Sequence, residues 1–164
     1  MHDFVQDLRY AIRQMTATNR PALSSMVNDL TRLGDNTNNG AFSMAMAEMF
    51  SYFAGSSTYT TGGRTATKRD YPGNSNARGG ALADGHALAS STATTYTSPI
   101  ADNCQKNFII FISNGTSTVN ADNSATESYL ATLKGATPTQ IQLNPSGSEA
   151  DWSDEYAEFM SNSD

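Results

Sequence analysis

The chain has 164 residues, enough for one domain with a sizeable core, and only 16% of them are charged. The formal net charge is −6 and the basic residues are scattered, so no basic stripe is present that would bind a nucleic-acid backbone. No apolar run has the length of a membrane span. Cys104 is the only cysteine, which excludes an internal disulfide. It is either a free or buried thiol, or it forms a disulfide with a residue outside the chain.

Helical periodicity dominates the first third of the chain. Apolar residues recur every three or four positions and predict amphipathic helices over residues 3–16, 21–33 and 41–53. Pro21 suits the start of the second of these helices, and Gly34 suits its end. Each helix is expected to bury its apolar stripe in a core.

The middle of the chain is polar and lacks a sustained period. A Gly/Ser/Thr-rich stretch, about 54–103, is interpreted as an insertion in a single partial domain that spans 1–164. Within it, residues 81–89 predict at most a short, weak helix that Gly85 interrupts.

An unbroken apolar run, Phe-Ile-Ile-Phe-Ile at 108–112, is followed by the turn sequence Ser113-Asn114-Gly115. Continuous apolar character over this length predicts a β-strand covered on both faces, as in the centre of a parallel sheet. Ligand-contacting groups collect beyond the carboxyl ends of such strands, so Ser113 and Asn114 are candidate site residues. The alternative interpretation is that Asn-Gly only turns the chain.

Two further helices are predicted towards the C-terminus, at 125–134 and 149–160. Ser148 and Asp151 have the spacing of a capping box at the start of the last helix. One parallel strand among several helices cannot satisfy its own backbone groups, so its neighbours are expected to lie in sequence outside this chain. The chain is therefore interpreted as the middle of an α/β domain.

A metal site is predicted only from distant elements. Thr37, in a polar loop before the third helix, and Asn114 can meet at one rim of a parallel sheet, where oxygen ligands suit Mg²⁺. Loop 35–40 is not a calcium loop, because Met46 stands where the closing carboxylate belongs. His86 has no second His or Cys at ligand spacing.

Catalytic motifs are missing from the sequence, which contains no nucleophile elbow, zinc-protease motif or phosphate-binding loop. Nothing near Cys104 would lower the pKa of its thiol. The chain is therefore expected not to be an enzyme. A structure that placed His86 within hydrogen-bond reach of a Ser or of Cys104 would favour an enzyme instead.

Several blocks resemble a known family. Tyr96-Thr-Ser-Pro-Ile and Cys104-Gln-Lys-Asn-Phe-Ile-Ile-Phe-Ile-Ser-Asn-Gly closely resemble the N-terminal von Willebrand factor A-like region of type IV pilus tip-associated biogenesis proteins of the PilY/PilC type. The resemblance continues through Thr139-Gln-Ile-Gln-Leu-Asn-Pro-Ser-Gly-Ser and Asp151-Trp-Ser-Asp-Glu-Tyr-Ala-Glu-Phe-Met. Residues 41–55 are similar to the family's helix after its threonine loop.

This resemblance implies an incomplete von Willebrand factor A-like (Rossmann-like) three-layer α/β fold, helix-rich around one central parallel strand. It implies an exported protein of a Gram-negative bacterium, located in the periplasm, on the outer-membrane surface or at the pilus tip. The implied function is a non-enzymatic binding and assembly module for pilus biogenesis and adhesion. Its partners would be pilus tip subunits, other assembly proteins, or a host or abiotic surface. The alternative is a purely structural, degenerate A domain.

The resemblance also assigns site residues. A domains bind a metal through an Asp-x-Ser-x-Ser loop, a Thr and an Asp. Thr37 resembles that Thr, Asn114 stands in the place of the Asp, and Ser113 replaces the Thr that precedes it. Because the Asp-x-Ser-x-Ser loop is absent from the chain, the implied Mg²⁺ or Mn²⁺ site is incomplete and weak. Ser113 and Asn38 are the residues expected to contact a binding partner at this rim.

Overall fold

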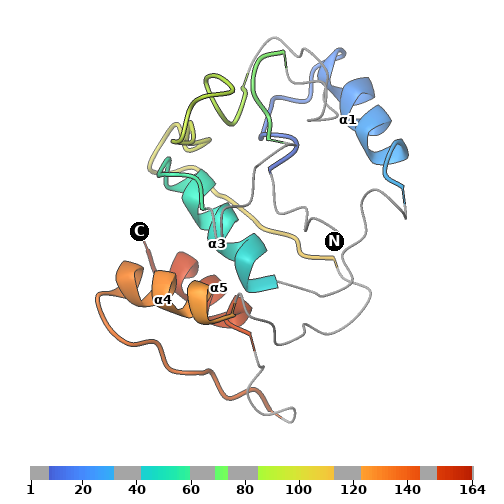
Figure 1. The fold of residues 1–164 in the computed structure, drawn as a ribbon. Helices are drawn as coiled ribbons and strands as arrows, with labels where there is room; N and C mark the ends of the chain where they lie inside the picture. Colours follow the sequence, from blue (N-terminus) through green and yellow to red (C-terminus); the bar gives the residue numbers. More distant parts are fainter. Residues whose placement is uncertain are drawn as a thin grey trace. The chain divides into compact units, whose positions relative to one another are not determined.

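The computed structural model describes residues 8–31, 42–59, 69–73, 85–112, 123–144 and 151–163. These residues form four helices (Figure 1). The only β pairing between two described residues is an isolated antiparallel bridge that joins Ser57 and Thr95. The helices are α1 (Asn19–Asn28), α3 (Phe42–Phe53), α4 (Asn123–Lys134) and α5 (Ser153–Ser161).

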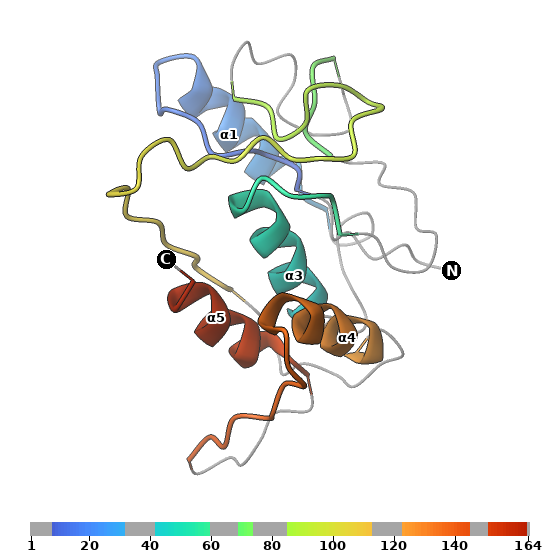
Figure 2. The same cartoon turned by 90° about the vertical axis from the view of Figure 1, so that its left-hand side faces the viewer.

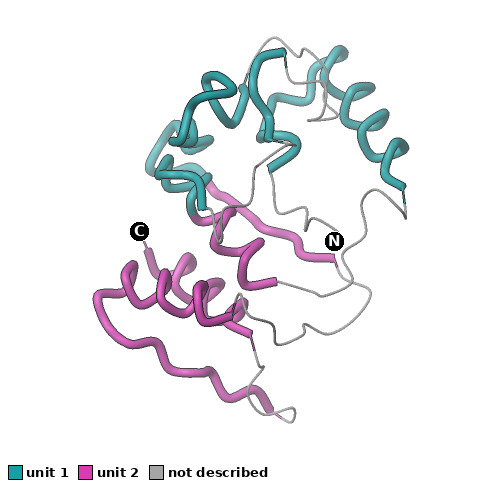
Figure 3. Tube along the Cα trace, viewed as in Figure 1, with its two compact units in different colours: residues 1–37, 51–105 teal, residues 38–50, 106–164 magenta. Residues whose placement is uncertain are grey.

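The chain divides into two compact units (Figure 3). Unit 1 comprises Met1–Thr37 and Ser51–Gln105, and unit 2 comprises Asn38–Phe50 and Lys106–Asp164. Helix α3 lies mostly in unit 2, while its last turn belongs to unit 1.

The expected three-layer α/β fold is wrong. Residues 108–112 follow an irregular, extended path, and no described strand pairs with them. Their side chains are exposed instead of being covered on both faces. The described part of the chain is helix-rich and contains no sheet, so the von Willebrand factor A-like architecture is not present there. An apolar run specifies a preference for burial, but it cannot supply the neighbouring strands that burial in a sheet requires.

Helices α3 and α4 end where glycine permits a left-handed backbone. Gly55 and Gly135 have φ values of 59° and 64°. In each case the next N–H reaches back across the last turn, from Ser56 to the Ser51 carbonyl at 2.9 Å and from Ala136 to the Ala131 carbonyl at 3.2 Å. This is the Schellman arrangement, which satisfies carbonyls that a helix end leaves open.

Unit 2 is built from helix packing (Figure 2). The Phe50 ring of α3 lies 6.5 Å from the Tyr129 ring of α4 and 5.5 Å from the Phe159 ring of α5, measured between centroids. Buried polar contacts fix the register of the helices, because Tyr156 Oη donates to the Thr126 carbonyl at 2.8 Å. Leu130 is fully buried on α4.

Unit 1 is mostly irregular chain. Backbone hydrogen bonds join its segments, for example from Thr58 N to the Thr94 carbonyl at 2.8 Å and from Leu88 N to the Asp70 carbonyl at 2.9 Å. Its core cluster is small and contains mainly alanine and aromatic side chains: Ala11, Tyr52, Ala87, Leu88 and Tyr96.

The predicted helices have mixed outcomes. Those at 41–53 and 125–134 are confirmed as α3 and α4, and the last begins at Ser153 instead of 149. Residues 8–16 are not helical, and neither are residues 85–89, of which 87–89 form bends, so these two predictions are wrong where the chain is described. Among the described residues, no helix combines the length and the apolar character needed to cross a bilayer.

Candidate functional site

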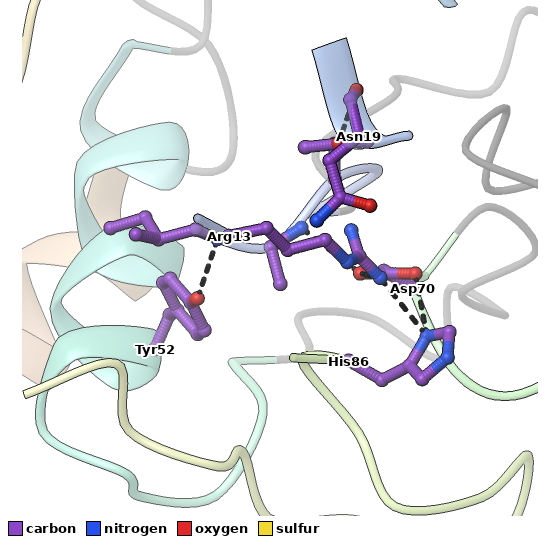
Figure 4. A network of polar contacts seen from close by, with 8 residues as sticks. Arg13, Asn19, Tyr52, Asp70 and His86 are labelled. Carbon is purple, nitrogen blue, oxygen red and sulfur yellow. Dashed lines mark hydrogen bonds and ion pairs between the residues drawn. The ribbon is translucent and has the colours of Figure 1, made fainter. Parts of the chain in front are cut away.

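A buried charged network in unit 1 is the most concentrated polar chemistry among the described residues (Figure 4). Arg13 Nη2 lies 2.6 Å from Asp70 Oδ2, and both side chains are about 1% exposed. His86 Nδ1 lies 3.1 Å from Asp70 Oδ1 and 3.1 Å from Arg13 Nη2. The Ala11 N–H donates to Asp70 Oδ2 at 3.0 Å. The Asp70 side chain therefore contacts two other segments of unit 1, residues 11–13 and His86.

The tautomer of His86 decides which of its two contacts is a hydrogen bond. If Nδ1 carries the proton, it donates to the Asp70 carboxylate, while Arg13 Nη2 binds the other carboxylate oxygen. If Nδ1 is unprotonated, it accepts from Arg13 Nη2, which lies at the same distance of 3.1 Å. In both forms Nδ1 is held between the Arg13 and Asp70 side chains.

Two tyrosines, Tyr52 and Tyr10, contact the chain at this network. Tyr52, on the last turn of α3, accepts a hydrogen bond from the Ile12 N–H at 2.9 Å (Figure 4). Burial raises the pKa of the Tyr52 phenol above its ordinary value, so the hydroxyl stays neutral at physiological pH. The Arg13 guanidinium also lies over the Tyr10 ring, 4.6 Å from its centroid, which adds a cation–π contact.

An Asp–His pair can act as a general base, so a catalytic role for this network needs to be tested against its geometry. Such a role requires a nucleophile on the remaining ring nitrogen of His86. Within the described residues, the hydrogen bonds of His86 go to Asp70 and Arg13, and none reaches a Ser, Thr or Cys side chain. The contacts tie residues 11–13, 70 and 86 together.

A second polar cluster lies at the start of α5. Asp151 is fully buried, and its Oδ1 accepts from the Ser153 N–H at 2.9 Å. Glu155 is also buried and accepts from the Ile141 N–H at 2.6 Å. Burial, followed by the effect of the neighbouring Asp154 carboxyl group, raises the pKa of Glu155 to about 7. Among the described residues, no group of three or more His, Cys, Asp or Glu is arranged to hold a metal ion.

Most of the residues predicted for a site do not belong to the part of the chain that the structure describes. Thr37, Asn38, Ser113 and Asn114 lie outside the described residues, so the incomplete Mg²⁺ or Mn²⁺ site stays a prediction. Cys104 is described, exposed and not part of a disulfide. Its N–H donates to Asp102 Oδ1 at 2.7 Å in a local turn, and its pairing with an external residue also stays a prediction.

Arg13 and Asp70 were not predicted as functional or structural partners. Arg13 was part of an expected helix, and Asp70 stood in a polar stretch interpreted as an insertion. Their separation in sequence leaves no local pattern, and a lone His86 was the only chemical signal at this place. Comparison of the chain with protein-family models, curated proteins and solved structures finds no match.

Proposed function

We propose that the chain is a non-enzymatic binding and assembly module of a type IV pilus tip-associated protein, acting in pilus biogenesis and surface adhesion. The sequence blocks at 96–100 and 104–115 support this proposal, since their resemblance to the PilY/PilC type rests on residue identity and not on a sheet. The proposal includes export to the periplasm, the outer-membrane surface or the pilus tip of a Gram-negative bacterium.

The observation that carries the binding role is the exposure of residues 108–112. Five consecutive large apolar side chains are solvent-accessible there, and they lie inside the most distinctive of the resembling blocks. Single exposed apolar residues are ordinary on protein surfaces, whereas a contiguous apolar patch marks an interaction site. Tip subunits or other pilus assembly proteins are the partners proposed for it.

Binding to isolated pili tests this function. Pili purified from the source bacterium are immobilised, and binding of the full chain is followed by interferometry. We expect saturable binding that Ile110→Lys weakens by at least about tenfold, because a charge replaces an apolar contact. Val27→Lys is the matched control, since Val27 is an exposed apolar residue of α1 in unit 1. Absence of binding by the unsubstituted chain would contradict the proposal.

A purely structural role is the second candidate. The Arg13–Asp70–His86 network favours it, because these buried groups bind one another and hold unit 1 together. A spacer of this kind would not bind isolated pili, yet deleting its gene would still reduce the number of surface pili. Pilus counts by electron microscopy, combined with the binding assay, separate the two candidates.

A further inference from the structure

The segment 108–112 has two unequal faces. Phe108, Ile110 and Ile112 are 81%, 85% and 89% exposed, whereas Ile109 and Phe111 are 39% and 49% exposed. Exposure thus alternates with a period of two, as it does in a β-strand that lies with one face on a support. The support is α3, because the Phe111 and Phe42 rings meet edge-to-face at 4.7 Å.

The backbone edges of this segment are open towards the rest of the described chain. No hydrogen bond joins the backbone of 108–112 to another described residue, in contrast to the bridged pair Ser57 and Thr95. The composition is aromatic and β-branched, which suits a strand, and the segment carries no charge. An open, apolar, uncharged edge is a template for pairing with another strand.

We infer that residues 108–112 pair antiparallel with the same residues of a second copy of the chain. This inference rests on the proposed binding function of the segment and adds a second copy of the chain as the partner of its backbone edge. A two-fold axis through Ile110 places Phe108 opposite Ile112 of the second copy and Ile109 opposite Phe111. Both are aromatic–β-branched cross-strand pairs, which stabilise a sheet. The antiparallel direction also keeps Lys106 of one copy away from Lys106 of the other, whereas parallel in-register pairing would place the two lysines side by side.

The available area sets the strength of this dimer. The five side chains expose on the order of 500 Å² of surface per copy, so two copies offer on the order of 1,000 Å² in total. This is the lower limit for a specific interface, and edge pairing covers only part of it. Hydrogen bonds between the two backbones add to the free energy of association, and five paired residues form roughly four to six of them. The dimer is therefore weak and forms at high concentration, and it leaves the outer face available to a pilus partner.

Cysteine cross-linking tests both the partner and the register. The full chain is used with Cys104→Ser, and either Ile110→Cys or Phe108→Cys is added at about 100 µM protein, a concentration suited to a weak interface. At the two-fold axis, the Ile110 positions are about 4.5–5.5 Å apart between Cα atoms, within disulfide range. The Phe108 positions are offset by four residues, or roughly 13 Å, and cannot be bridged. The two sites are similarly exposed and lie on the same face, so each is a control for the other.

We expect the Ile110→Cys variant to form disulfide dimers at least about tenfold faster than the Phe108→Cys variant. Equal rates would indicate parallel or nonspecific association and would overturn the inference. Sedimentation of the unsubstituted chain provides a second measurement, and no rise in mean mass up to about 1 mM would also overturn it. If the chain binds pili but shows no selective cross-linking, this inference is overturned and the proposed function is supported. If it shows selective cross-linking but does not bind pili, the proposed function is contradicted and the pairing of two copies is supported.

Discussion

The two units reach stability by different means. Unit 1 contains α1 and the last turn of α3, and much of the remainder is irregular chain held by hydrogen bonds and by the buried Arg13–Asp70 ion pair. Unit 2 packs α3, α4 and α5 through aromatic rings and buried apolar side chains. Polar contacts in unit 1 concentrate stability in a few groups, whereas packing in unit 2 distributes it. The same kind of substitution should therefore have different consequences in the two units.

The largest effect is expected at Asp70. Asp70→Asn removes the negative charge opposite Arg13 and leaves a buried guanidinium without its counter-charge. Breaking a buried ion pair from one side costs about 3–5 kcal/mol. Urea unfolding followed by circular dichroism measures the loss. Asp102→Asn, an exposed carboxylate of the same unit, is the control and should change stability by less than about 0.5 kcal/mol. Equal effects of the two substitutions would mean that the network does not hold unit 1.

Helix packing in unit 2 gives the next largest effect. Leu130→Ala deletes a fully buried side chain on α4, and the resulting cavity should cost about 2–4 kcal/mol. Thr132→Ala, on the exposed side of the same helix, should have a small effect. Trp152 is the only tryptophan and lies in unit 2, so its fluorescence during urea unfolding reports this loss. An unchanged midpoint for Leu130→Ala would contradict the packing of α4.

Glu155 gives unit 2 a pH dependence. Its pKa is raised from 4.5 to about 7 by burial first and then by its contact with Asp154, so the folded state holds a proton that the unfolded state releases. Stability from this group is therefore present at low pH and falls by on the order of 3 kcal/mol as the pH rises from about 4.5 to above 7. Glu155→Gln should flatten this slope in urea midpoints measured between pH 5 and 8, a range around the raised pKa. Glu158→Gln, at an exposed position of α5, should leave the slope as it is.

The smallest effect on folding is expected at the outer face of 108–112. Phe108 is 81% exposed, so Phe108→Asp should change the free energy of unfolding by less than about 0.5 kcal/mol. Phe111→Asp should cost more, because Phe111 contacts Phe42 on α3. Thermal unfolding of the two variants compares the faces directly. Equal destabilisation by the two substitutions would contradict the difference between the two faces.

The sequence predicted local structure better than long-range structure. Periodicity located α3 and α4 because their buried residues, such as Met46 and Leu130, recur at helical spacing. The same reasoning predicted a buried stripe on the second helix, yet α1 has no buried residue and Val27 is 54% exposed. Hydrophobic spacing reports which side chains could share a face, but it does not supply the surface that covers them.

The prediction of a buried strand at 108–112 is wrong for a related reason. Its composition favours an extended conformation, and the segment is indeed irregular and extended, but a sheet needs partners that the described chain does not provide. The Arg13–Asp70–His86 network was missed because its members are brought together only by tertiary structure. No spacing rule connects a residue near position 13 to one near position 70, so the only local chemical signal is the Asp-Gly-His sequence around His86.

Hydrogen exchange of the backbone amides at 108–112 tests the central claim most directly, namely that this segment is an open edge which a second copy closes. The account predicts rapid exchange in dilute protein and slower exchange as the concentration rises, while the amides of α4 remain protected throughout. Strong protection of 108–112 at every dilution would contradict it, because the segment would then be paired within a single chain.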